Sequence, residues 1–193
     1  MMSNIQENGY NDTYLFDPEV FLRIDESKFK SDYKNDVTPL KPGVNLQIRP
    51  LRLGDFDKGF LDLLKELTVV GDVSQEQFIT QFNKMKACSD TYYITVIEDT
   101  SKSQIIGTAT LVMEKKFIHQ ATARARIEDV VVGNDYRGLQ LGKVLVDLLV
   151  CLSQVLGCYK VSLECKEHNV KFYAMFGFEK SPEQNFMQIR FFD

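Results

Sequence analysis

A glycine-containing turn, Arg137 to Lys143, lies directly before the clearest helix-like stretch of the sequence. The N-terminus of a helix exposes unpaired N–H groups and a partial positive charge, and a glycine there lets a phosphate approach the backbone. Arg137 and Lys143 add side-chain charge at either end of the turn. These features predict a site for an anionic group, and an ordinary glycine-containing helix start is the alternative.

The turn does not match the P-loop of nucleotide-binding proteins. A P-loop has the form GxxxxGK followed by Ser or Thr. Here Gly138 and Gly142 are one residue too close together, and Val144 follows Lys143. Binding of a nucleoside triphosphate is therefore not supported.

Two neighbouring acids, Glu128 and Asp129, lie near the start of an otherwise apolar stretch, 127–132, that is predicted as a strand. Side chains alternate between the two faces of a strand, so at least one carboxylate should approach the sheet interior or a cleft. The alternative is an acid pair in solvent at a strand end. His119 follows Lys116 in a basic loop, where it could bind a ligand or act as a structural histidine.

The elements that would position these residues are strands and helices in a regular order. Alternating β-branched and aromatic residues predict strands, and apolar residues at helical spacing predict helices. Ser74 and Gln77 form a capping pattern, and Gly157 and Gly177 end two helices. The predicted strands are 45–50, 92–98, 105–114, 127–132, 159–165 and 186–191, and the predicted helices are 56–70, 74–85, 139–156 and 169–176.

This order predicts an α/β fold in which helices cover both sides of one mixed sheet. The 193 residues are long enough for a single domain, which we place at 44–193. Residues 1–43 carry scattered aromatics and end in turn-forming Pro39, Pro42 and Gly43. We expect them to form an arm that is partly flexible or docks on the domain.

Composition argues against several classes of protein. A net charge of −4 disfavours nucleic-acid binding, which usually needs a basic surface. Apolar runs are too short to span a bilayer and the N-terminus lacks a secretory pattern, so we expect a cytoplasmic protein without integral membrane contact; peripheral association through the arm is an alternative. The four cysteines lack CxxC pairing, which predicts reduced, mostly buried thiols and no metal.

The turn resembles the first signature of the GNAT acetyltransferases, in which Arg or Gln, two residues, Gly, one residue and then Gly or Ala precede the central helix. Arg137 and Gly142 match it, whereas Gln140 occupies the position of the middle glycine. Gln140 suits the signature if it has helical dihedral angles and its N–H faces the pyrophosphate. The stretch 169–178 is similar to the second signature, in which an asparagine opens a short helix and a tyrosine lies near the thioester sulfur.

The GNAT resemblance implies a mixed, mostly antiparallel sheet with a V-shaped splay between its two central strands. It also implies acetyl-CoA as the co-substrate, without a metal. The residues implied in acetyl-CoA binding are Val130, Val131, Val132, Arg137, Gly138, Leu139, Gln140, Leu141, Gly142, Lys143, Asn169, Phe172 and Tyr173.

A more detailed similarity, from about Val44 to Arg190, is to the glucosamine 6-phosphate N-acetyltransferases; it includes the stretches 116–119, 126–132 and 157–160. It implies acetylation of the 2-amino group of D-glucosamine 6-phosphate, in the route to UDP-N-acetylglucosamine, by a homodimer. Lys116, His119 and Arg190 would supply cations for the sugar phosphate. The residues implied in sugar binding are Thr68, Lys116, Phe117, Ile118, His119, Glu128, Asp129, Val130, Glu164 and Arg190.

The same resemblance implies direct attack of a neutral amine on the thioester in a ternary complex, with Glu128, Glu164 and Tyr173 as catalytic residues. Glu128 would orient the sugar and its amine, and the main-chain carbonyl of Glu164 would accept a hydrogen bond from that amine. An N–H near Val130 would hold the oxyanion, and Tyr173 would protonate the departing sulfur. Cys158 and Cys165 lack an obvious base partner, which disfavours an acyl-cysteine route.

Two other functions stay open at this point. A GNAT enzyme could acetylate another small amine or a protein amine, although a polyamine site should be acidic, unlike the set Lys116, His119 and Arg190. A non-catalytic CoA-binding scaffold would keep the fold and lose the chemistry, and the presence of Glu128 and Tyr173 argues against it.

Overall fold

A computed structural model of the protein describes residues 12–191. Within this range, five strands form one sheet in the order in which they occur along the chain. The first four strands pair with one another in antiparallel orientation. The fifth strand is parallel to the fourth. The strands are β1 (Leu46–Pro50), β2 (Tyr92–Asp99), β3 (Gln104–Lys115), β4 (Ala123–Val132) and β5 (Cys158–Leu163).

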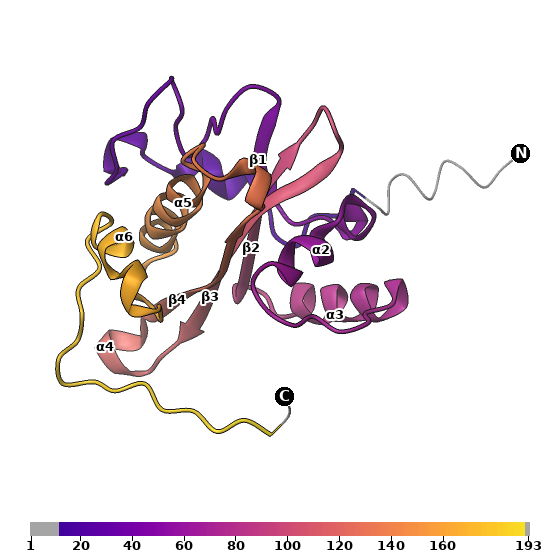
Figure 1. The fold of residues 1–193 in the computed structure, drawn as a ribbon. Coiled ribbons are helices and arrows are strands. Elements are labelled where there is room, and N and C mark those ends of the chain that lie inside the picture. Colours follow the sequence, from indigo (N-terminus) through magenta and orange to yellow (C-terminus); the bar gives the residue numbers. More distant parts are fainter. Residues whose placement is uncertain (1–11, 192–193) are drawn as a thin grey trace, which may run out of the picture.

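Helices cover both faces of this sheet, which confirms the predicted α/β fold (Figure 1). One face is covered by α5 (Leu141–Val155), with α6 (Val170–Ala174) close by, and the other by α2 (Phe60–Lys65) and α3 (Gln75–Ala87). A single turn, α4 (Ile118–Ala121), joins β3 to β4.

Two hydrophobic cores lie on opposite faces of the sheet because strand side chains alternate. On β3, Ile106 belongs to the core beneath α5, while its neighbour Ile105 belongs to the core beneath α2 and α3. The apolar stripe predicted on the long helix is confirmed, since its residues recur at helical spacing and are at most 1% exposed. These residues are Leu141, Val144, Leu145, Leu148, Leu149 and Leu152.

The start of α5 differs from the prediction. The helix begins at Leu141 because Gly138 and Gln140 adopt left-handed backbone conformations, with φ of 82° and 66°. The condition under which Gln140 would suit the GNAT signature, helical dihedral angles, is therefore not met. Gly157, with φ of 75°, lies directly after the C-cap residue of the helix, where a left-handed glycine was predicted.

The helix predicted over 56–70 is split. Residues Leu53–Lys58 form a 3₁₀ helix, Gly59 turns the chain at φ of 77°, and α2 ends at Lys65. The buried Arg49 guanidinium donates to both carboxylate oxygens of the buried Asp55 at 2.7 Å, which ties the 3₁₀ segment to β1. The break occurs because this ion pair and the left-handed glycine fix two different helix directions.

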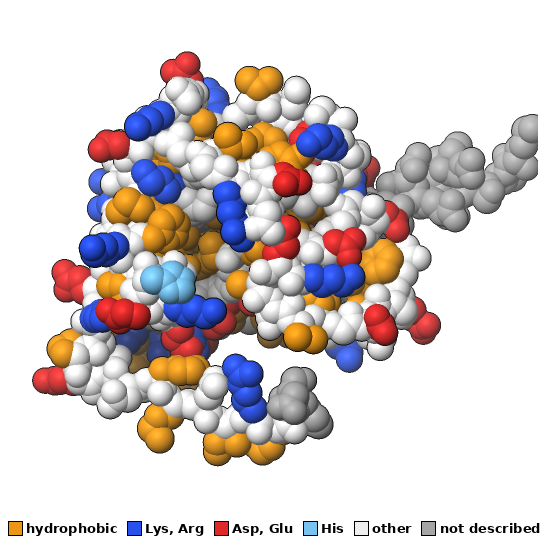
Figure 2. Space-filling model, in the orientation of Figure 1, with side chains coloured by type: hydrophobic (Ala, Val, Ile, Leu, Met, Phe, Trp, Pro, Cys, Tyr) orange, Lys and Arg blue, Asp and Glu red, His pale blue; other side chains and the backbone are white. Residues whose placement is uncertain are grey.

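The strand predicted over 186–191 is not formed. Residues 178–191 run beneath the body of the domain as a tail without helix or strand (Figure 1). Figure 2 shows hydrophobic side chains gathered on this tail, where Phe186, Met187, Ile189 and Phe191 are between 62% and 88% exposed. A strand requires a neighbouring strand to satisfy its N–H and C=O groups, and the tail pairs with none in the described part of the chain.

The cysteines are free thiols, but the expectation that they are mostly buried is wrong. Cys151 is buried on α5 and Cys158 is half-buried, whereas Cys88 and Cys165 are exposed. The two exposed residues lie just beyond the ends of α3 and β5, where packing no longer covers them. Of the helices in the described range, none has the length and apolarity needed to cross a bilayer.

Candidate active site

The predicted anion site is formed by the turn before α5. The first N–H groups of this helix, from Leu141 to Lys143, have no partner within the helix. Arg137 is exposed beside them, and Lys143 is half-buried. Gly138 has open space where a side chain would extend, and its φ of 82° is costly for other residues. The turn therefore combines free N–H donors, two cations and room for a ligand.

The second predicted signature lies against the first. α6 follows a 3₁₀ turn, Glu167–Asn169, and carries Phe172 and Tyr173. A Cβ atom placed on Gly142 would lie 3.6 Å from the ring of Phe172, so α6 packs directly on the first turn of α5. Two segments of the predicted acetyl-CoA site, separated along the chain by a helix and a strand, thus meet in space.

Tyr173 is half-buried in an aromatic cluster. Its ring lies edge-on to Phe172 and to Phe178, at centroid distances of 5.0 and 6.2 Å. Burial raises the pKa of the Tyr173 phenol, and the neighbouring Cys165 raises it further. The hydroxyl is therefore protonated at neutral pH and can donate a proton or a hydrogen bond.

β4 and β5 pair along only part of β4. Their parallel pairing ends at Ile127 and Leu163, and from Glu128 to Val132 the strand β4 pairs with β3 alone. The opening has the form of the predicted splay, although β5 is an edge strand of the described sheet and not one of two central strands. Val131 is buried in the core beneath α2 and α3, while Val130 and Val132 are half-buried. The backbone of β4 is consequently free to bind a ligand on the side that β5 leaves.

A bulge at Asp129 changes the positions of the two strand acids. The β3–β4 register shifts between Thr108 and Thr110, and Asp129 adopts a left-handed φ of 51°. Both Glu128 and Asp129 are exposed, so neither carboxylate lies in the sheet interior, and a position of one of them beside a cleft stays a prediction. Partial burial of the Asp129 carboxyl nevertheless raises its pKa.

Arg126 joins two of the predicted catalytic residues. Its Nε lies 3.1 Å from a carboxylate oxygen of Glu128, and its terminal nitrogen forms an ion pair with Glu164. Arg126 was not predicted as a site residue. An arginine alternating with apolar residues on a strand gives no sequence signal, because it is indistinguishable from an ordinary outward-facing residue.

The basic loop between β3 and β4 carries four of the predicted sugar-binding residues. The Lys116 ammonium pairs with Glu114, which is also bound by Arg124, and these two cations lower the pKa of Glu114 to about 2. His119 adopts a left-handed conformation and stacks on Tyr159 at a centroid distance of 4.1 Å. The remaining two are apolar residues whose exposure is unusually high: Phe117 at 100% and Ile118 at 61%.

Three predicted residues lie apart from these groups. Thr68 is exposed on the loop after α2, and Arg190 is exposed on the tail. Within residues 12–191, Arg190 forms no ion pair with another side chain, and its place in a cation set with Lys116 and His119 stays a prediction. Leu139 is 50% exposed at the outer side of the anion turn.

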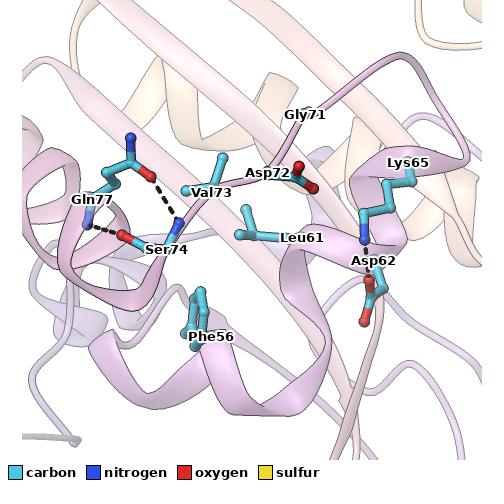
Figure 3. A pocket seen from close by; sticks show the side chains of 9 residues that line it. All are labelled: Phe56, Leu61, Asp62, Lys65, Gly71, Asp72, Val73, Ser74 and Gln77. Atoms are coloured by element: carbon cyan, nitrogen blue, oxygen red, sulfur yellow. Dashed lines mark hydrogen bonds and ion pairs between the residues drawn. The ribbon is translucent and has the colours of Figure 1, made fainter.

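A hollow of about 460 Å³ lies elsewhere, between α2 and α3 (Figure 3). Lys65 at its rim is paired with Asp62 at 2.7 Å, and Ser74 and Gln77 cap α3 by reciprocal hydrogen bonds. The lining includes none of the predicted site residues, so this hollow is not the candidate active site. Among the described residues, no group of three His, Cys, Asp or Glu side chains is arranged to hold a metal ion.

Known proteins resemble this chain in sequence and fold. Residues 58–178 match the acetyltransferase (GNAT) family. The chain is 47% identical over 182 residues to the probable glucosamine 6-phosphate N-acetyltransferase of Drosophila melanogaster. The aligned region covers 93% of this chain and 83% of that protein. It is 43% identical over 139 residues to glucosamine 6-phosphate N-acetyltransferase 1 of Dictyostelium discoideum, covering 72% and 88%. The crystal structure of glucosamine-6-phosphate N-acetyltransferase from Arabidopsis thaliana aligns with a TM-score of 0.71 at 37% identity, covering 77% and 99%.

Proposed function

The chain belongs to the GNAT family of acetyltransferases, and we infer that it transfers the acetyl group of acetyl-CoA to the 2-amino group of D-glucosamine 6-phosphate. The observation that carries this inference is the meeting of the anion turn before α5 with the Tyr173-bearing helix α6, next to the opening between β4 and β5. The acceptor follows from the names of relatives that share 47% and 43% of their residues with this chain over the matched regions.

Acetyl-CoA would bind along the anion turn and the free edge of β4. The N–H groups at the start of α5, with Arg137 and Lys143, suit the negative charge of its pyrophosphate. The backbone of Val130 to Val132 is left unpaired on the side facing β5 and suits the amide groups of the pantetheine chain. In this position the thioester carbonyl lies within reach of a Val130 N–H, which would stabilise the oxyanion.

The acceptor amine would lie beside Glu128 and the main-chain carbonyl of Glu164, two residues whose side-chain carboxylates both pair with Arg126. The neutral amine attacks the thioester carbonyl, the C–N bond forms, and the tetrahedral intermediate then breaks its C–S bond. Nitrogen releases one proton to solvent as the amide forms, Tyr173 donates a proton to the CoA sulfur, and the resulting phenolate regains a proton from solvent, so the net result is the transfer of one proton from nitrogen to sulfur. Lys116 and His119 on the neighbouring loop would bind the sugar phosphate.

We further propose that the active protein is a homodimer. Support comes from the large apolar side chains that one chain leaves exposed on its tail and at Phe117 and Ile118, since contiguous exposed apolar surface marks interaction sites. In the part of the chain that the structure describes, β5 is also an edge strand of the sheet, with no strand paired to its outer side. In such a dimer Arg190 could complete the cation set of the partner's site.

A thiol-release assay with several amines tests the proposed reaction. We expect acetyl-CoA-dependent release of CoA with glucosamine 6-phosphate, and little release with glucosamine, spermidine or a peptide with a free N-terminus. Equal turnover of glucosamine with and without its phosphate would contradict the roles of Lys116 and His119. Binding of acetyl-CoA without turnover of any amine would favour the scaffold alternative.

A further inference from the structure

A buried acid on α5 is bound by the segment that precedes the domain. Asp147 is fully buried, and its carboxylate accepts hydrogen bonds from the N–H groups of Lys30 and Ser31 at 2.9 and 3.0 Å and from the Tyr33 hydroxyl at 3.0 Å. A buried carboxylate is stable only when such donors replace water. The arm segment 30–33 therefore has a fixed position on the surface of α5.

The same segment binds two residues of the anion turn. The Gln140 side chain accepts from the Lys34 N–H at 3.0 Å and donates to the Lys34 carbonyl at 3.1 Å. The Lys143 ammonium donates to the carbonyl of Asp32 at 3.4 Å, and the Lys143 carbonyl accepts from the Tyr33 hydroxyl at 3.3 Å. Both cofactor-site side chains are thus held by arm backbone rather than by the domain.

The three contact residues lie at the start of α5 and on one side of it. Lys143 and Asp147 are four positions apart in the helix and so share one side, and Gln140 is the N-cap residue directly before it. Val144 and Leu148, each directly after one of the contact residues in the helix, are fully buried against the sheet. One helix therefore packs on the sheet with one face and carries the arm on another, and the arm contacts end at the anion turn.

We propose that the arm segment 30–34 is a positioning element for acetyl-CoA, acting through Gln140. The left-handed backbone conformation is unfavourable for residues other than glycine. Gln140 nevertheless adopts it, with φ of 66°, at the N-cap of α5. Its two hydrogen bonds to Lys34 stabilise that conformation and so fix the direction of the N–H groups that follow. This inference rests on the proposed acetyl-CoA site.

Two substitutions of Gln140 separate its side-chain bonds from its backbone conformation. Gln140→Ala removes both bonds and disfavours the left-handed conformation, so we expect the KM for acetyl-CoA to rise about tenfold, with kcat and the sugar KM within about twofold. Gln140→Gly removes the bonds but allows the conformation, and its KM should rise less than about threefold. The matched control is Gln154→Ala, an exposed glutamine on the same helix, which should behave as wild type.

An unchanged KM in Gln140→Ala would overturn the proposal. An equal loss in the alanine and glycine variants would also overturn it, because positioning through the left-handed backbone requires the glycine variant to recover affinity. Thermal unfolding of each variant shows whether the domain is intact, since a purely structural role would lower the melting temperature and leave the KM unchanged.

Variants on the arm side test the same coupling away from the turn. Asp147→Asn replaces one acceptor oxygen with an amide donor that faces N–H groups. If Asp147→Asn does not fold, the milder Tyr33→Phe takes its place, because it removes only one hydroxyl. Each should raise the KM for acetyl-CoA, and combining either with Gln140→Ala should add little, because both act through one contact. Fully additive effects would overturn the proposal.

Ligand linkage supplies a readout independent of turnover. If the arm favours acetyl-CoA binding, CoA must favour the docked arm by the same factor. We expect CoA to slow amide exchange of residues 30–34 in the full chain, and to do so less in Gln140→Ala. A wild type that binds CoA without protecting this segment would overturn this inference alone, whereas a wild type that binds no CoA would overturn the proposed function and this inference together.

Discussion

Tyr173 donates to the departing sulfur in the proposed mechanism, and its removal gives a direct test. Tyr173→Phe keeps the ring packing against Phe172 and Phe178 and deletes only the hydroxyl. Because general acids typically contribute a factor of about 100 or more, we expect kcat to fall by about that factor. The affinity for CoA, measured by calorimetry, should stay within about twofold.

A matched control for this substitution is Tyr92→Phe, at the start of β2 in the other core. It should leave kcat unchanged. Wild-type turnover in Tyr173→Phe would remove this hydroxyl from the mechanism and leave positioning and the oxyanion contact as the main contributions.

Glu114 predicts a specific acid dependence of stability. Arg124 and Lys116 lower its pKa to about 2 in the folded state, below the usual 4.5. A folded-state pKa below the unfolded value means that the stabilisation is present above pH 4.5 and is lost as the pH falls toward 2. Melting temperatures measured between pH 2 and 6 should therefore fall less steeply in Glu114→Gln than in the wild type.

The control for that measurement is Glu183→Gln, which changes an exposed glutamate on the tail. Its pH curve should run parallel to that of the wild type. A parallel curve in Glu114→Gln would instead show that the two cations do not stabilise the fold through this carboxylate.

Among the elements, β4 has two functions along its length. Ala123 to Ile127 pairs with strands on both sides and packs in the core, whereas Glu128 to Val132 has β3 as its only strand partner among residues 12–191. The bulge at Asp129 lies where the second neighbour is lost. Bulges redirect side chains next to functional sites, which explains how one strand supplies both a core and a site.

The cap of α3 should affect stability without affecting catalysis. Ser74 Oγ accepts from the Gln77 N–H at 3.2 Å, and Gln77 Oε1 accepts from the Ser74 N–H at 2.8 Å. Ser74→Ala should lower the free energy of unfolding by about 1 kcal/mol, measured by urea denaturation. The kinetic constants should not change, because α3 lies outside the proposed site. The control Ser181→Ala, on the exposed tail, should leave stability unchanged.

At the level of the whole molecule, the exposed tail predicts association. Replacing Phe186 and Ile189 with serine removes apolar surface that is 62% and 81% exposed in one chain. If the tail packs on a second copy, sedimentation should show a shift from dimer to monomer at micromolar concentration, with loss of activity. An unchanged mass would show that this surface does not form the dimer contact.

Mixing two inactive variants tests whether Arg190 acts in the partner's site. In a mixed dimer of Arg190→Ala and Tyr173→Phe, one site regains both groups only if Arg190 comes from the other subunit. Random mixing would then restore about a quarter of the activity, since half of the dimers are mixed and each has one complete site. Absence of recovery would place Arg190 in the site of its own subunit.

Features whose causes are local could be predicted from the order of the residues. The hairpin of β2 and β3, the Ser74 cap, the apolar stripe of α5 and the helix stop at Gly157 follow from contacts between residues close in the chain. Periodicity records which face of an element is buried, and capping and turn residues record where it ends. The anion turn could be found for the same reason, because a helix N-terminus creates its own donors.

The completion of these parts depends on contacts between segments that are distant in the chain. Gln140 is left-handed and bonded to Lys34, 106 positions away, and Arg126 binds Glu164, 38 positions away. The tail has a strand pattern but no strand partner in the described chain. Periodicity reports burial and not the identity of the partner, so contacts between distant segments, including the arm on the anion turn, become visible only when the chain is folded.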